Sequence, residues 1–202
     1  MQYRWLSHAF LVFGGAASSI TAGSSCALDP VHDSSVKALG DEDGEFPPGP
    51  YHRAGQACTV CHGGQGPAKS TFFMAGTIFM SPGTRDEAGR VAQKAEIRIR
   101  DANNPMYYKC VRANCRGNFY VTSREFPSGI TFPVKVSVSQ GTQERVMNSL
   151  IGREPSCGAC HKRPGFFDSP GQVYLYTSES EVPQTEEEEC NPSTPEPERD
   201  CE

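Results

Sequence analysis

A five-residue pattern, Cys-x-x-Cys-His, occurs twice in this chain and constrains its structure more than any other feature. The first copy runs from Cys58 to His62, and the second runs from Cys157 to His161. Three residue identities at fixed offsets, repeated within one chain, are hard to obtain by chance. Any fold for the 202 residues must therefore accommodate two such sites.

This spacing is typical of c-type haem attachment, in which both thiols add to the vinyl groups of one porphyrin. The adjacent histidine then binds the iron as the proximal axial ligand. On these motifs the chain resembles dihaem c-type cytochromes, which implies electron transfer through two covalently bound haem c groups and redox proteins as partners. The predicted haem-binding residues are Cys58, Cys61 and His62 for the first haem and Cys157, Cys160 and His161 for the second.

The sixth coordination position of each iron separates two functions. A protein ligand there favours electron transfer, whereas an open position favours a haem-based sensor or a small-molecule-binding protein. His52 precedes the first motif and Met147 precedes the second, and both are candidate metal ligands beside the proximal histidines. The competing candidates are His32, Met74, Met80 and Met106. An electron carrier that is not an enzyme is the leading hypothesis, with the sensor or a haem redox enzyme as its alternatives.

A structural zinc site is a further alternative. Two Cys-x-x-Cys pairs can supply four thiolates to one zinc ion, with a long insertion between the pairs. Such a site does not need the histidine that follows each pair.

Charged residues bear on both cofactors and partners. Arg53, Lys69, Lys162 and Arg163 lie beside the motifs and either pair with haem propionates or are ordinary surface charge. The net charge of −5 gives no reason to propose a nucleic acid as partner.

The N-terminus predicts export. Residues 1–25 combine a basic residue, a broken apolar stretch and small residues, as in a signal peptide. The residues Gly23 to Cys26 resemble a bacterial lipobox, whose cysteine becomes the lipidated N-terminus of the mature chain. Cleavage after Ala22 is the alternative and leaves Cys26 as a free thiol. The expected location is the periplasm, or the outer membrane or cell surface as a lipoprotein, with Cys26 as the only membrane anchor.

The cysteine count agrees with an oxidising compartment. The chain has nine cysteines, and the two motifs use four of them. Cys110 and Cys115 are close enough in sequence to close a small loop by a disulfide, and Cys190 and Cys201 form a second candidate pair. Cys26 is then left over.

Short alternating segments predict a mainly β fold. Apolar and polar residues alternate in 72–80, 95–100, 119–122 and 134–139, with turn residues between them. The expected architecture is a small antiparallel β-sandwich over residues 71–140, bracketed by two c-type haem-binding segments, 51–70 and 141–176. The segment Thr142–Gly152 fits either a short helix or a final strand.

The middle segment resembles the carboxypeptidase regulatory-like domain, a small transthyretin-like β-sandwich. Gly76 to Phe79, Ala95 to Ile99 and Asn114 to Val121 carry this resemblance, with Asn114 at a position where the family usually has aspartate. It implies a structural scaffold and adds no catalytic residue.

The flanking segments lack apolar periodicity. Residues 26–50 are predicted to be a linker, and residues 177–202 a disordered acidic tail. Because the two motifs bracket the sandwich, we expect the two haems to lie near each other at one edge of it.

Overall fold

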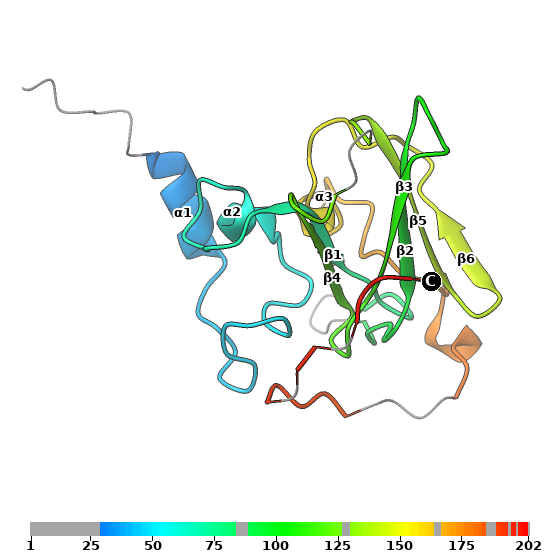
Figure 1. Cartoon of the computed structure of the whole chain (residues 1–202). Helices are drawn as coiled ribbons and strands as arrows, with labels where there is room; N and C mark the ends of the chain where they lie inside the picture. Colours follow the sequence, from blue (N-terminus) through cyan, green and yellow to red (C-terminus); the bar gives the residue numbers. More distant parts are fainter. Residues whose placement is uncertain are drawn as a thin grey trace, which may run out of the picture. The chain divides into compact units, whose positions relative to one another are not determined.

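Six short strands dominate the structure and form two antiparallel sheets (Figure 1). The computed structural model describes residues 29–83, 89–126, 130–163, 167–184, 189–193, 195–196 and 198–201. The predicted signal peptide, 1–25, and Cys26 lie outside these residues. The prediction of a mainly β chain with small antiparallel sheets is confirmed.

The strands separate into a pair and a group of four. β1 pairs with β4, and the other four strands follow the order β3-β2-β5-β6. Their bounds are β1 Phe72–Thr77, β2 Glu96–Asp101, β3 Tyr108–Arg112, β4 Asn118–Thr122, β5 Val134–Gln140 and β6 Gln143–Val146.

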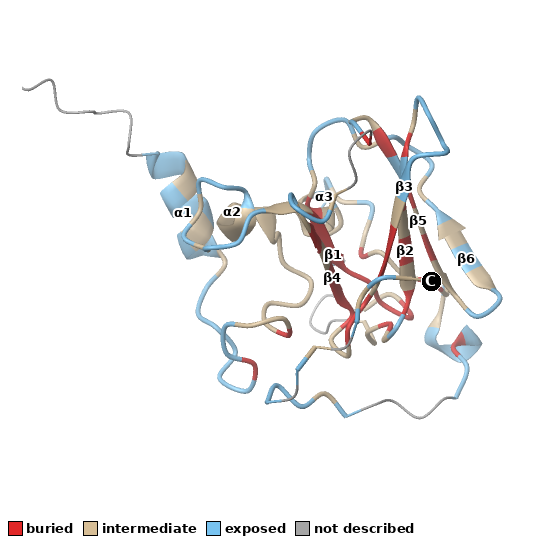
Figure 2. Ribbon diagram, viewed as in Figure 1, coloured by how far each residue is buried: buried red, intermediate tan, exposed pale blue. Residues whose placement is uncertain are grey.

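Both sheets contribute to one hydrophobic core. Met74 and Phe119 come from the β1–β4 pair, and Ile97, Val111 and Val136 come from the larger sheet. The buried positions in Figure 2 follow the strands for this reason. In β2, Ile97 and Ile99 are fully buried while the arginines between and after them are not, as the sequence alternation predicts.

The turn before β4 depends on Asn114 and Gly117. The Asn114 side-chain oxygen accepts hydrogen bonds from the N–H groups of Arg116 and Asn118 at 2.9 and 3.1 Å. Gly117 has φ +70°, and a Cβ there would lie 2.4 Å from the Ile78 carbonyl oxygen. Only glycine therefore fits this position.

One strand was not predicted, and another lies in a segment for which the sequence left two alternatives open. β3 was not predicted, because its burial pattern has two adjacent buried residues, Cys110 and Val111, in place of alternation. The ambiguous segment Thr142–Gly152 contains the strand β6, which pairs with β5 from Ser137 to Gln140.

The segment predicted to be a linker, 26–50, contains a helix and a buried residue in the part that the structure describes. Helix α1 spans Pro30–Ala38, with Asp33 in its first turn and Lys37 in its last, where each charge complements the helix dipole. Phe46 is buried, with the Arg116 guanidinium 3.9 Å above its ring. None of the helices in the described ranges is long and apolar enough to cross a membrane.

Three one-turn helices are also present in the residues that the structure describes. α2 spans Thr59–His62, α3 spans Cys157–Cys160, and the 3-10 helix η2 spans Glu179–Glu181.

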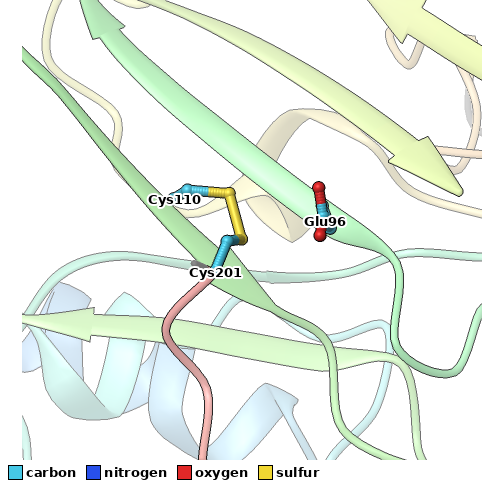
Figure 3. Close-up of side chains that lie close together, drawn as sticks. All are labelled: Glu96, Cys110 and Cys201. Atoms are coloured by element: carbon cyan, nitrogen blue, oxygen red, sulfur yellow. A yellow bond between two sulfur atoms is a disulfide. The ribbon is translucent and has the colours of Figure 1, made fainter.

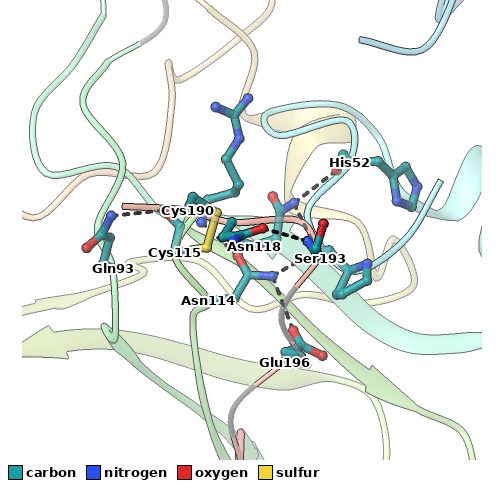
Figure 4. Close-up of a disulfide and its surroundings, with 11 residues drawn as sticks. His52, Gln93, Asn114, Cys115, Asn118, Cys190, Ser193 and Glu196 are labelled. Atoms are coloured by element: carbon teal, nitrogen blue, oxygen red, sulfur yellow. Dashed lines mark hydrogen bonds between the residues drawn. A yellow bond between two sulfur atoms is a disulfide. The ribbon is translucent and has the colours of Figure 1, made fainter. Parts of the chain in front are cut away.

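The predicted disulfide pairing was wrong. Cys110 pairs with Cys201, and Cys115 pairs with Cys190 (Figures 3 and 4). The reason is that the tail returns to β3, where the Arg112 N–H donates to the Arg199 carbonyl at 2.5 Å. Cys110 in β3 and Cys115 shortly after it therefore each face a cysteine of the tail.

The described part of the acidic tail is held to the body of the protein, where the sequence predicts disorder. Besides the disulfides, Glu196 accepts hydrogen bonds from Asn114 and from the Tyr120 hydroxyl, the latter at 2.7 Å. Lys109 forms an ion pair with Asp200 at 2.6 Å.

Candidate haem sites

Each Cys-x-x-Cys-His motif forms one helical turn. The His62 N–H donates to the Cys58 carbonyl at 2.9 Å, and the His161 N–H donates to the Cys157 carbonyl at 2.7 Å. Residues three and four positions apart lie on the same side of a helix. The two thiols and the imidazole of each motif are therefore presented on one side of its turn.

The two motif histidines share the same hydrogen bond. His62 Nδ1 lies 2.9 Å from the Ser70 carbonyl oxygen, and His161 Nδ1 lies 2.8 Å from the Gly171 carbonyl oxygen. A carbonyl can only accept, so Nδ1 carries the proton in both rings. Nε2 is then the nitrogen with a lone pair available for a metal.

The loop after each motif supplies that carbonyl. In the first site, the Ala68 N–H donates back to the Cys61 carbonyl at 3.2 Å. In the second site, the Ser169 hydroxyl donates to the Cys160 carbonyl at 2.9 Å and accepts from the Gly171 N–H at 3.1 Å. Different residues thus fold both loops back against their own motif.

The first motif lines a cavity of about 790 Å³. Cofactor pockets typically occupy roughly 300–1,000 Å³. Besides Cys58, Cys61 and His62, its walls include His52, Phe72 and Tyr120, together with the basic residues Arg53, Lys69 and Arg199. We call this the first cavity.

A stack of rings fixes the proximal histidine of the first cavity. The His62 and Phe72 rings are parallel within 6°, with centres 3.9 Å apart, and Tyr120 stacks on Phe72 at 4.7 Å. The Arg199 guanidinium covers Tyr120 at 3.8 Å. Burial is the main cause that lowers the pKa of His62, with the nearby His52 adding to it and the bond to Ser70 opposing it. The ring is therefore neutral at pH 7.

The second motif lines a separate cavity of about 710 Å³. Cys157, Cys160 and His161 share this second cavity with Met147, Val146, Leu150, Arg145 and Arg153. Val146 and Leu150 are 50 % and 52 % exposed. Large apolar side chains at the wall of an open cavity are what an apolar bound group would cover.

The two motifs pack against each other and against β1. A Cβ on Gly158 would lie 2.3 Å from the Gln56 carbonyl oxygen, so the second motif touches the residue just before the first. The Thr59 hydroxyl donates to Glu154 at 3.2 Å. Phe119 lines both cavities, so its buried ring stands between them.

Gly76 provides the space for the second motif on β1. A Cβ there would lie 2.6 Å from Cys157 Cβ and 2.8 Å from its sulfur. The sequence pattern did not reveal this role, because Gly76 lies within a segment that was predicted only to be a strand. A glycine inside a strand pattern is the available signal, since it often marks a close approach.

The four motif cysteines are free thiols, in contrast to the two disulfides of the same chain. Burial raises the pKa of Cys58 to about 11 and that of Cys157 to about 12. Both thiols are therefore protonated at neutral pH.

The geometry does not favour the zinc alternative. In the parts of the chain that the structure describes, the one group of three candidate ligand atoms within 4.8 Å of one another is Glu96, Cys110 and Cys201. The two sulfur atoms of that group are bonded to each other, as Figure 3 shows, so they are not thiolate ligands. The four motif thiols do not converge on one point in this way.

The basic residues fit in part. Arg53 and Lys69 line the first cavity, and Arg53 also pairs with Glu42 at 2.8 Å. Lys162 and Arg163 are not among the residues lining the second cavity, and Lys162 faces Asp168 at 3.6 Å. Arg145 and Arg153 take that place, and Arg199 joins the first cavity. Their distance from the motifs in sequence hid them.

Comparison with known proteins yields no relative: no protein family, no curated protein and no solved structure matches the chain. The resemblances to dihaem cytochromes and to the carboxypeptidase regulatory-like domain therefore remain predictions.

Proposed function

We propose that this chain is an exported dihaem c-type cytochrome that transfers electrons. The observation that carries the proposal is the matched pair of sites. In each, one helical turn presents two thiols and a histidine at the wall of its own cavity, and the Nδ1 bond to a downstream carbonyl leaves Nε2 for iron.

The residues fit a haem in each cavity. Cys58 and Cys61 would hold the first haem covalently with His62 as its axial ligand, and Cys157, Cys160 and His161 would hold the second. Each haem, when bound, supplies an iron that takes up and releases one electron. The protein supplies ligation, burial and basic partners for the propionates, which together set the potentials.

The contact between the motifs supports electron exchange within the chain. Gly158 abuts Gln56, and Phe119 borders both cavities. Two haems held covalently on these adjoining turns would stay close to each other. Soluble or membrane-bound redox proteins are the partners this function requires.

Export agrees with the presence of two disulfides. The two disulfides favour an oxidising compartment, which is also where haem is attached to such motifs. We place the protein in the periplasm or, if Cys26 is lipidated, on a membrane surface.

The test is to export the protein from a host with haem-attachment machinery and to titrate its optical spectrum with a reductant. We expect two haems per chain that survive acid–acetone extraction and are reduced reversibly, one electron each. The matched control is the same protein from a host without that machinery, which should be colourless. Haem that extracts into solvent, or bound zinc in place of haem, would contradict the proposal.

A further inference from the structure

We propose that the two haem irons carry different sixth ligands, His52 at the first site and Met147 at the second, so that the two sites have unequal potentials. The inference rests on the proposed function and adds the ligand set of each iron.

The spacing of two rings supports His52 at the first site. The ring centres of His52 and His62 are 6.0 Å apart, with 38° between their planes. A metal–imidazole bond is about 2 Å long and the ring centre lies about 1 Å beyond the nitrogen, so two imidazoles on opposite sides of one metal have centres about 6 Å apart. The observed spacing matches that requirement.

The Nδ1 side of the His52 ring lies against the backbone of Gly49. Its Nδ1 contacts the Gly49 carbonyl oxygen, with the Gly49 N–H 3.2 Å from the same nitrogen. Because Nδ1 faces Gly49, Nε2 is the nitrogen available for a metal, as it is in His62 and His161.

The backbone of His52 is anchored in advance. The buried Asn118 side chain donates to the His52 carbonyl at 3.0 Å, and Asn114 donates to the Pro50 carbonyl at 2.8 Å, as Figure 4 shows. Ordering this segment in the folded protein lowers the entropic cost of ligation.

The second cavity offers a different ligand. Outside its motif, Met147 is the one histidine or methionine among the residues that line it. Met147 directly follows β6, and its N–H donates to the Val136 carbonyl at 3.0 Å, which fixes the backbone at the cavity wall. No second imidazole lines this cavity, so bis-histidine ligation is confined to the first site within the described residues.

Unequal ligands separate the potentials. A thioether in place of an imidazole raises the reduction potential of a c-type haem. The first site is then the lower-potential one, and electrons run downhill from the first iron to the second.

The test uses oxidised protein with two covalent haems, verified by mass, so that failure of haem attachment is scored separately as failure of the proposed function. We expect the near-infrared charge-transfer band of thioether-ligated iron in the wild type. Met147→Ala should lose that band and bind carbon monoxide at one reduced haem. Met147→His should keep both irons low-spin and shift the higher of two potentials downward. Met106→Ala, at an 83 % exposed methionine, should change nothing.

At the first site, His52→Ala should convert one iron to high spin and expose it to carbon monoxide, while the thioether band persists. His32→Ala is the matched control and should retain both low-spin signals. The inference is overturned if Met147→Ala keeps the band, if His52→Ala leaves the spin state unchanged, or if wild-type protein with two covalent haems shows no thioether band.

Discussion

The two motif segments begin from the same local structure and end in different surroundings. Both form a one-turn helix, and both tie a histidine Nδ1 to a downstream carbonyl. The first segment then meets a histidine, an aromatic stack and Arg199 from the tail, whereas the second meets Met147 and half-exposed apolar residues after β6. Under the proposed function, the motif would specify how a haem is attached, and the surrounding fold would specify the chemistry of that haem.

The largest expected effect is the loss of one haem when the cysteines of one motif are replaced. Cys58→Ser with Cys61→Ser should reduce the covalent haem content from two per chain to one, because serine forms no thioether. Cys157→Ser with Cys160→Ser should do the same at the other site. The absorbance of denatured protein per mole of chain measures the loss, and the remaining haem should show the spectrum of the untouched site. Loss of both haems from either variant would contradict independent attachment.

Removing the disulfide between Cys110 and Cys201 should lower the stability of the protein. Of the two haem spectra, it should change only that of the first site. Cys110→Ser with Cys201→Ser should lower the free energy of unfolding by about 2–4 kcal/mol, because the unfolded chain is no longer cross-linked. It also removes the covalent link near Arg199, which covers Tyr120 in the stack that ends at His62 and keeps its ion pairs with Glu125 and Glu196. Denaturant unfolding followed by haem absorbance measures both.

The other disulfide provides the control for that experiment. Cys115→Ser with Cys190→Ser should cost a similar stability while leaving Arg199 held through Cys201. A spectrum that changes equally at both haems in either variant would show that the tail has no special link to the first site.

A smaller change tests the contact between the motifs. Gly158→Ala places a Cβ 2.3 Å from the Gln56 carbonyl and should destabilise the protein by about 1–3 kcal/mol, because backbone must move to make room. Gly44→Ala, where a Cβ meets nothing within 4 Å, should change stability by no more than about 0.5 kcal/mol. Equal melting temperatures for the two variants would argue that the motifs do not touch.

The smallest expected effect is a loss of stability in acid, and it should be the same for both haem sites. Hydrogen bonds from Thr131, Asn104 and Asn103 lower the pKa of Asp101 to about 2. Because its pKa is lowered, the ionised carboxylate stabilises the fold at pH values above its ordinary pKa of 3.8. This stabilisation is lost as the pH falls toward 2. Asp101→Asn should flatten that part of the stability profile, measured by thermal unfolding between pH 2 and pH 6. An effect of this substitution on one haem alone would contradict the prediction.

Sequence periodicity was sufficient for β2 and β5, and it failed for β3. β2 and β5 follow the period of two expected of half-buried strands, whereas Cys110 and Val111 of β3 are both buried and masked that strand. Helix α1 has no buried residue, so the apolar periodicity that would have signalled a helix is missing from residues 30–38.

The attachment residues could be predicted because a covalent linkage demands fixed spacing, and the cavity walls could not. Phe72 and Tyr120 meet because β1 pairs with β4, and Arg199 reaches them from a tail that is cross-linked back to β3 and its neighbouring turn. Disulfide pairing itself was wrong because proximity in sequence was taken for proximity in space. Cys110 and Cys115 are close in the chain, yet each lies beside a tail residue.

The most direct test of the central claim is to locate the haems on the chain. Protein exported from a host with haem-attachment machinery would be digested, and the peptides identified by mass. We expect one haem on the peptide that contains Cys58 and Cys61, and one on the peptide that contains Cys157 and Cys160. Unmodified peptides at both positions, from protein made in a host that matures a control cytochrome, would contradict the assignment of this chain as a dihaem electron carrier.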